Sequence, residues 1–164
     1  IAKLSVEKYL FFYHNTYNLS YTSLRYANVY GPRQDPYGEA GVVAIFIQQM
    51  LQGKQPVING DGKQTRDFVY VHDVAKANLL ALTHDVTGEI NISTGIETSV
   101  NQIFQEIKQI THANAPEKHG PPMPGEQLRS VLSFDKAKKV LGWAPSISFS
   151  EGLQNTVAFF QKND

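Results

Sequence analysis

Arg66 and Asn28 are the two side chains whose chemistry and place in the sequence best suit an anion. Arg66 directly precedes a predicted strand, and its guanidinium group can donate to two phosphate oxygen atoms at once. Asn28 follows a predicted strand, where crevices of α/β sheets usually hold ligands, and its amide can donate to a diphosphate. Each also has a structural interpretation: Arg66 would form an ion pair with Asp67 or another surface ion pair, and Asn28 would be a turn residue before Gly31. We therefore expect an anion site only if the fold brings both side chains together.

The start of a predicted helix offers a third anion-binding group. Residues 41–43 open a helical pattern, and the free backbone N–H groups of a first turn favour an anion or a polar base edge. The sequence contains neither G-x-G-x-x-G nor G-x-x-x-x-G-K-[ST]. The five histidines are scattered, and no histidine or carboxylate cluster has metal-ligand spacing. These residues predict no metal site and give no independent signal for a dinucleotide.

Alternating strands and helices would have to position these groups. Helices are predicted over residues 2–17, 42–52 and 100–110, and others begin with the N-caps Asp73, Asp135 and Ser150. Strands are predicted over residues 21–26, 57–59, 67–71 and 89–92, with loops over 28–37 and 114–125. Ser99 and Gln102 form a capping box before the most regular helix. The alternation indicates an α/β protein.

Composition limits the class of protein. The chain has 164 residues, 41% of them hydrophobic, which is enough for one domain with a real core. Its 15 basic and 15 acidic residues give zero net charge, so nucleic acid and anionic lipid are not attracted at long range. The absence of cysteine excludes disulfides and thiolate zinc sites and is compatible with a cytoplasmic location. No apolar stretch approaches the ~20 residues of a membrane-spanning helix, so no membrane partner is predicted.

The first helical pattern starts without a capping residue. Ile1 rather than Met precedes it, so we expect the helix to begin upstream and the chain to be part of a longer protein. Leu10, Phe11 and Phe12 lie on more than one helical face, which is typical of a helix that is buried on several sides. We therefore expect this helix to associate with other protein surface.

Six segments, in order, carry a resemblance to a known family. They are residues 2–7, 24–34, 60–75, 91–95, 124–126 and 141–145, of which the longest reads GDGKQTRDFVYVHDVA. Together they resemble the extended short-chain dehydrogenase/reductase family, in its NAD-dependent epimerase/dehydratase branch, and are most similar to the UDP-glucose 4-epimerase group over essentially the whole chain. The resemblance implies the C-terminal substrate-binding part of that fold, with a small sheet packed with helices. Residues 1–38 would be a remnant of the Rossmann half, and residues 39–164 mostly substrate-binding domain.

The resemblance assigns Lys3 a catalytic and cofactor-binding role. Lys3 matches the lysine of the family's Y-x-x-x-K helix, whose tyrosine would lie two positions before Ile1. On one helical face the lysine ammonium lowers the pKa of that tyrosine, which removes a proton from the sugar while hydride passes to NAD. The family lysine also holds the nicotinamide ribose, and Tyr26 would lie near the nicotinamide. Taken alone, Lys3 is an exposed helical lysine and Tyr26 a core tyrosine of a strand.

Six residues match the family's nucleotide-sugar site: Asn28, Val43, Val57, Asn59, Arg66 and Glu126. By resemblance Asn28 and Arg66 bind the diphosphate, while the Val43 backbone and residues 57 and 59 meet the base. Glu126 would accept hydrogen bonds from the ribose hydroxyls. The alternatives are core packing for Val43 and an exposed loop position for Glu126.

Two positions depart from the family pattern. Asn59 stands where the family often has an aromatic residue, which puts base stacking there in doubt. Met123 stands where the epimerases usually have a second arginine on the diphosphate. This change weakens diphosphate binding or transfers the contact to Arg129.

The resemblance implies a UDP-hexose 4-epimerase that uses NAD, of which this chain supplies the substrate-binding part and is inactive alone. A dehydratase, decarboxylase or reductase acting on another nucleotide sugar stays open, as does a non-catalytic nucleotide-sugar-binding module. The first helix of the family helps to form a dimer interface, so we expect a homodimer through residues 2–17. No nucleic-acid partner is predicted.

Overall fold

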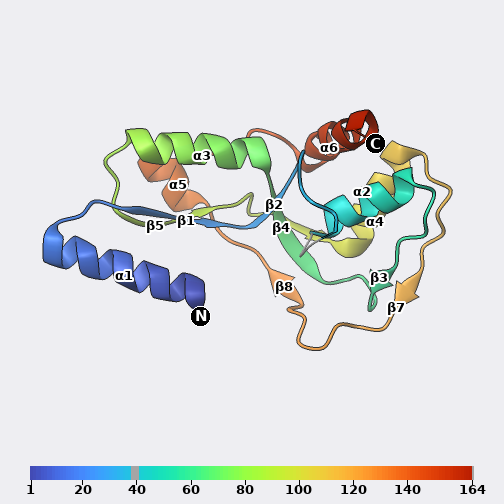
Figure 1. Ribbon diagram of the computed structural model, residues 1–164, viewed down its shortest axis with the longest axis horizontal. Helices are drawn as coiled ribbons and strands as arrows, with labels where there is room; N and C mark the ends of the chain where they lie inside the picture. Colours follow the sequence, from blue (N-terminus) through green and yellow to red (C-terminus); the bar gives the residue numbers. More distant parts are fainter. Residues whose placement is uncertain (38–40, 164) are drawn as a thin grey trace.

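A computed structural model describes residues 1–37 and 41–163. A pair of parallel strands lies at the centre of one part of the fold (Figure 1). β1 (Thr22–Tyr26) pairs with β5 (Gly88–Ile92), with Thr22 opposite Gly88 and Tyr26 opposite Ile92. Helices α3 (Val71–Thr83) and α5 (Asp135–Leu141) cover one side of this pair, and α1 (Ala2–Tyr17) lies on the other (Figure 1). The covered side holds a core of buried residues: Val69, Val74, Ala77, Ile90, Ile92, Ala137, Leu141 and Trp143.

A second sheet continues from this layer. β4 (Thr65–Tyr70) runs parallel to β2 (Asn28–Tyr30) on one edge and antiparallel to β6 (Glu97–Ser99) on the other. The short strand β8 (Arg129–Ser130) also pairs with the start of β4, in parallel. A separate parallel pair joins β3 (Ile58–Asn59) to β7 (His119–Gly120). β4 is therefore the strand on which most of this half of the fold is assembled.

Three helices enclose the main core beside β4. They are α2 (Val42–Leu51), α4 (Val100–Thr111) and α6 (Phe149–Asn163) (Figure 1). Their apolar residues recur at helical spacing, and those that face the core include Phe46, Ile47, Phe104, Leu153 and Val157. The Phe46 and Phe104 rings meet edge to face, with centroids 5.8 Å apart.

The long helices and the strands of the first sheet confirm the sequence predictions. α1 spans the predicted residues 2–17, α2 begins at the predicted place, and Ser99 and Gln102 form the expected capping box before α4. Gly142 ends α5 in the left-handed conformation that glycine adopts readily. The alternation of helices and strands makes the chain an α/β protein, as predicted.

Several short strands and the start of α3 differ from the predictions. Residues 28–30 form β2 instead of opening a loop, and the sequence does not predict β6, β7 or β8. α3 begins at Val71, so Asp73 lies inside its first turn and is not the N-cap. Its buried carboxylate accepts hydrogen bonds from the backbone N–H groups of Ser146 and Ile147 and from the Ser146 hydroxyl. Asp73 thus joins α3 to the segment before α6.

The caps of α5 and α6 also lie elsewhere than predicted. Asp135 is the first residue of α5, and its backbone N–H donates to Ser133 Oγ. α6 begins at Phe149, where Ser148 Oγ, rather than Ser150, accepts from the backbone N–H of Glu151. In both helices a serine placed two or three residues earlier along the chain satisfies a free N–H group.

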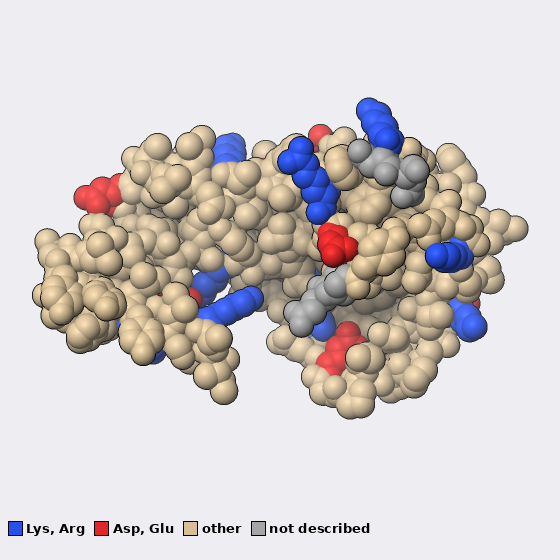
Figure 2. Space-filling view, viewed as in Figure 1, with Lys and Arg blue, Asp and Glu red and all other residues tan. Residues whose placement is uncertain are grey.

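Helix α1 contributes no residue to either hydrophobic core. None of its residues is buried, and no side chain caps its start. Glu7 holds it to β1 through a hydrogen-bonded ion pair with Arg25 and a hydrogen bond from Ser23. A notch opens between the start of α1 and the part of the molecule that carries β8 (Figures 1 and 2). Within residues 1–37 and 41–163, no helix combines the length and apolar character that crossing a bilayer requires.

Candidate functional site

A cavity of about 430 Å³ lies between β2, β4 and the start of α2. Asn28, Arg66 and Glu126 line it together with Val57 and Asn59. Its other lining residues are Gly41, Val42, Ile45, Phe46, Gln64, Phe68 and Val100. Five of the six residues predicted for the nucleotide-sugar site therefore meet at one place, and Val43 is the exception.

The pairing of β2 with β4 explains how Asn28 and Arg66 meet. Asn28 lies opposite Phe68 in the parallel ladder, and Arg66 precedes Phe68 by two residues on the same strand. Side chains two apart on a strand point to the same face of the sheet. Asn28, Phe68 and Arg66 consequently share the face that opens into the cavity.

Arg66 is held by Glu126 and not by its neighbour in the sequence. Arg66 Nη2 lies 3.5 Å from Glu126 Oε1, and Nη1 donates to the Thr65 carbonyl. Asp67 is buried and turned away, since its carboxylate accepts from the Thr94 hydroxyl and from the backbone N–H groups of Thr94 and Gly95. The predicted ion pair between Arg66 and Asp67 is therefore wrong, whereas Arg66 does form an ion pair with another residue, Glu126.

The first turn of α2 opens into the cavity without a side-chain cap. Gly41 is the N-cap, and both Gly41 and Val42 line the cavity. Their position offers backbone N–H groups to an anion or a polar ring edge. The Val43 side chain is 1% exposed and packs in the main core, as its structural interpretation predicted. A backbone contact from Val43 to a ligand stays a prediction.

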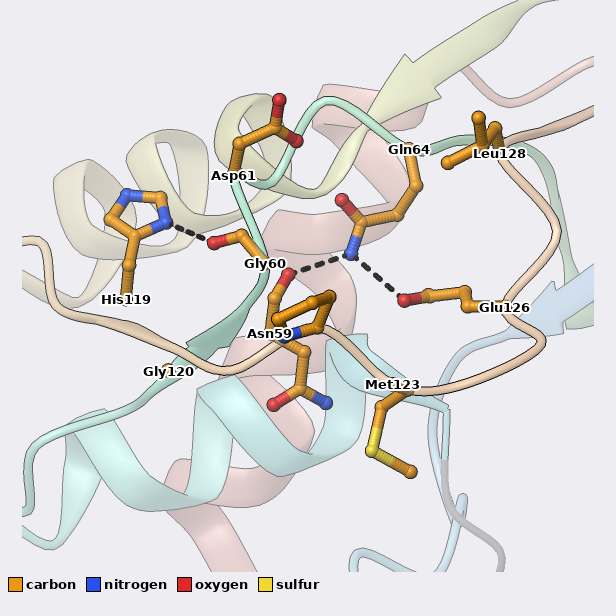
Figure 3. A pocket seen from close by; sticks show the side chains of 10 residues that line it. Asn59, Gly60, Asp61, Gln64, His119, Gly120, Met123, Glu126 and Leu128 are labelled. Carbon is orange, nitrogen blue, oxygen red and sulfur yellow. Dashed lines mark hydrogen bonds between the residues drawn. The ribbon is translucent and has the colours of Figure 1, made fainter.

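A second hollow of about 740 Å³ adjoins the first (Figure 3). The two share Asn59, Gln64 and Glu126, so these three residues form the wall between them. Its other lining residues include His119, Met123 and Leu128, and the lining is mostly apolar. Met123 is 58% exposed and brings no charge to the site.

Arg129 does not replace the missing second arginine at this cavity. Its guanidinium group binds Glu97, with Nη2 2.5 Å and Nε 2.7 Å from Oε1. Glu97 also accepts from the Thr65 hydroxyl, and these contacts hold the pKa of its carboxyl below the ordinary value. Arg129 therefore fastens β8 to β6, and it is not among the residues that line the Arg66 cavity.

His119 ties the loop that carries Glu126 to the turn after β3. Its Nδ1 lies 2.7 Å from the Gly60 carbonyl oxygen (Figure 3), and its Nε2 lies 2.8 Å from Glu117 Oε1. Both partners are acceptors, so only an imidazolium ring can donate to both. The Glu117 carboxylate, followed by the Gly60 carbonyl, raises the pKa of the His119 ring.

Lys3 and Tyr26 lie away from the Arg66 cavity. Lys3 is an exposed residue of α1, as its structural interpretation predicted. Tyr26 is 42% exposed, and its hydroxyl donates to Asn78 Oδ1 at 2.9 Å. It lines a separate hollow of about 460 Å³ between β1 and α3. Tyr26 is thus not the core residue that its structural interpretation expected.

Gln64 lines both hollows, although it was not among the site residues predicted from the sequence. Gln64 is 7% exposed, and its Nε2 donates to the Asn59 carbonyl at 3.0 Å and to Glu126 Oε2 at 3.4 Å. The strand period could have found it, because Gln64, Arg66 and Phe68 alternate along the chain. In the described part of the chain, no three His, Asp or Glu side chains gather as a metal ion would require.

Comparison with known proteins gives consistent relatives. The model of the NAD dependent epimerase/dehydratase family matches residues 1–93. A putative UDP-glucose 4-epimerase of Methanocaldococcus jannaschii is 47% identical over 164 residues, which cover 100% of this chain and 53% of that protein. The chain spans about half the length of the curated relatives it matches.

Solved structures agree with this relationship and with the predicted fold class. The UDP-glucose 4-epimerase of Thermotoga maritima with UDP-glucose superimposes with a TM-score of 0.97 at 52% identity, covering 99% of this chain and 52% of that one. The Thermus thermophilus enzyme, in complex with NAD, gives 0.87 at 41% identity over 96% of this chain and 51% of its own. The resemblance found in the six segments is therefore confirmed, and the chain belongs to the NAD dependent epimerase/dehydratase family.

Proposed function

We propose that this chain is the substrate-binding part of a nucleotide-sugar 4-epimerase that acts on a UDP-hexose. The observation that carries the proposal is the single cavity that joins Asn28, Arg66 and Glu126 at the uncapped start of α2. A guanidinium group and an amide suit a diphosphate, and a carboxylate can accept from both hydroxyls of a ribose. UDP-glucose, the ligand of the Thermotoga maritima relative, contains both groups.

In this proposal the remaining cavity residues meet the nucleoside. Val57 is partly exposed in the lining, and Asn59 lies in the wall between the two hollows. The Asn59 side chain offers hydrogen bonds rather than a stacking surface, so the base would be held by polar contacts and by the Val43 backbone. Residues 1–38 would complete the dinucleotide half, and residues 39–164 would form most of the substrate domain.

This chain has residues that suit only the nicotinamide end of NAD. The sequence has no glycine loop for a pyrophosphate, whereas Lys3 is an exposed cation on α1 that suits a ribose hydroxyl. Lys3 and Tyr26 would hold the nicotinamide end, and NAD would supply hydride transfer. The chain alone would bind substrate without turning it over. A homodimer through α1 and a cytoplasmic location stay predictions of the same proposal.

Calorimetry and a turnover assay test this proposal together. UDP should bind the 164-residue chain, and Arg66→Ala should abolish the binding heat while leaving the circular dichroism spectrum unchanged. With NAD and UDP-galactose, the chain alone should give no UDP-glucose. Absence of UDP binding would contradict a self-sufficient substrate site. Measurable epimerisation would contradict the proposal that this chain binds substrate without turning it over.

A related reaction is the second candidate, and Met123 favours it. Among the described lining residues Arg66 supplies the one guanidinium group, where the epimerase pattern usually has two. Asn59 departs from the same pattern. A dehydratase, decarboxylase or reductase acting on another nucleotide sugar would fit these departures. Competition of UDP-galactose against UDP-glucuronic acid for the site separates the candidates, since a hexose epimerase should prefer the neutral sugar.

A further inference from the structure

Gln64 is a buried amide in the wall between the two hollows. Its Nε2 faces two oxygen atoms, the Asn59 carbonyl at 3.0 Å and Glu126 Oε2 at 3.4 Å (Figure 3). Both are acceptors, so the amide must present its nitrogen to them, and the flipped amide would set oxygen against oxygen. The orientation of the Gln64 side chain is therefore fixed by its partners.

The backbone on both sides of this contact is also held. The Gln64 carbonyl accepts from the backbone N–H of Val100, at the start of α4. The Thr65 N–H donates to the Leu128 carbonyl at 2.9 Å, which fastens β4 to the loop that carries Glu126. Within that loop the Glu126 N–H donates to the Met123 carbonyl. Gln64 and Glu126 consequently meet across two segments that are joined beside the contact.

The Glu126 carboxylate lies between two partners, Gln64 and Arg66, which compete for its oxygen atoms. Its Oε1 lies 3.5 Å from Arg66 Nη2, while Oε2 faces Gln64. Without the amide, the carboxylate would be free to turn both oxygen atoms toward the guanidinium group, which is the favoured bidentate geometry. Such a turn would withdraw from the wall the acceptor that a hydroxyl group of the ligand needs.

We propose that Gln64 is a positioning residue that holds Glu126 at the wall, where it accepts hydrogen bonds from a vicinal diol of the ligand. This inference rests on the proposed UDP site and adds a determinant of its specificity. Gln64 would act on the ribose end of the ligand through Glu126, and not on the diphosphate that Arg66 would contact.

The test compares UDP with 2′,3′-dideoxyuridine diphosphate, which lacks the diol. Calorimetry of Gln64→Leu should show that the affinity for UDP falls roughly three- to tenfold, which corresponds to the loss of one hydrogen bond. Binding of the dideoxy analogue should change little, so the preference for the diol should shrink. Gln64→Glu, which keeps the shape but opposes two acceptors, should reduce the preference further.

Gln55→Leu is the matched control. Gln55 Nε2 also donates to two carbonyl oxygen atoms, those of Pro56 and Pro116, and Gln55 lines neither hollow. This variant should leave both affinities unchanged. Equal losses for UDP and its dideoxy analogue in Gln64→Leu would show a merely structural role and overturn the inference, as would no loss for either.

A ligand-free measurement keeps this inference separate from the proposed function. In the nuclear magnetic resonance spectrum, Glu126→Ala should shift the side-chain amide signals of Gln64 and leave those of Gln55 in place. If the wild-type chain binds neither nucleotide, the proposed function fails and this measurement still decides whether Gln64 holds Glu126. Unmoved Gln64 signals would overturn the contact itself.

Discussion

Glu126 stands beside Arg66 in the cavity wall, with its Oε1 3.5 Å from the Arg66 Nη2 atom. The Arg66 side chain is 19% exposed and the Glu126 side chain 28%, so water screens the pair only in part. An anion that enters this cavity meets a cation that is already partly neutralised. The charge of Glu126 therefore lowers the affinity of the site for anions, although its oxygen atoms add hydrogen-bond acceptors.

Glu126→Gln should separate these two effects. Removing the negative charge should tighten binding of inorganic pyrophosphate by roughly threefold or more, in line with the energy of one partly screened charge pair. The same change should reduce the preference for UDP over the dideoxy analogue. Calorimetry at low ionic strength measures both, and Glu151→Gln on α6 is the control. Weaker pyrophosphate binding in the variant would contradict the charge argument.

Arg66→Lys tests whether the fork geometry matters as well as the charge. Lysine keeps the positive charge but cannot donate two parallel hydrogen bonds to a phosphate. UDP affinity should fall roughly tenfold or more, as expected for charged hydrogen bonds. Arg25→Lys, which alters the α1–β1 ion pair instead, should leave UDP binding unchanged. Equal affinity in Arg66→Lys and wild type would exclude a bidentate contact.

Asp73→Ala should destabilise the fold more than any cap substitution. The buried carboxylate accepts two backbone N–H groups and one hydroxyl from residues 146 and 147. Truncation leaves these donors without a partner, at an expected loss of about 2–4 kcal/mol in the free energy of unfolding. Urea denaturation measures the loss, with exposed Asp85→Ala as reference. A loss below that of Asp85→Ala would mean that water replaces the carboxylate.

The His119 contact should make stability depend on pH. Because Glu117 and the Gly60 carbonyl raise the pKa of His119, the folded chain binds this proton more tightly than the unfolded chain. Its contribution is complete below the ordinary value of about 6.5 and is lost as pH rises through the raised pKa. The pKa of Glu117 is lowered by the same contact, so its contribution is lost on acidification below its ordinary value.

The free energy of unfolding of wild type and His119→Gln should therefore differ most at mildly acidic pH. Urea titrations at a series of pH values would show the two curves converging as the solution becomes alkaline. His14→Gln, remote from the β3–β7 pair, should follow the wild type throughout. A difference that grows with pH would contradict the charged form of His119.

Helix α1 should mediate self-association. Phe11 and Phe12 are more than half exposed, as are Leu4 and Tyr9 on the same helix. Exposed apolar side chains clustered on one helix are typical of a protein–protein interface, so light scattering should give a dimer. Replacing both phenylalanines with serine should yield a monomer, whereas Leu82→Ser on α3 should not. A monodisperse wild-type monomer would contradict this expectation.

The helices were predictable because their apolar periodicity is local, although the caps of α3, α5 and α6 lie elsewhere than predicted. α4 combines a capping box with apolar residues at helical spacing, and both follow from a few neighbouring residues. β3 falls within the predicted strand 57–59, but β7 and β8 have two residues each and exist only because a distant strand lies beside them. β7 and β8 leave no periodic signal in the sequence.

The residues that line the cavity were predictable only where the pairing of strands or the family resemblance indicates their positions. Asn28 and Arg66 meet because β2 and β4 pair in register, as expected for polar residues at strand ends. The partner of Arg66 could not be read from adjacent residues, since Glu126 reaches it from a loop. Gln64 escaped notice because an isolated amide in a turn sequence is ordinarily a surface residue.

The bond between Asp73 and Ser146 has a consequence for how the chain acquires its shape on the ribosome. When α3 has emerged, the Asp73 carboxylate still lacks the donors that are synthesised about seventy residues later, so burying it at this stage would cost its hydration without compensating hydrogen bonds. Trp143, whose indole nitrogen donates to the Asp73 carbonyl, arrives in the same late segment. Folding should therefore reach its cooperative end only after α5 and the start of α6 have left the exit tunnel, and chains arrested earlier should remain open to proteases.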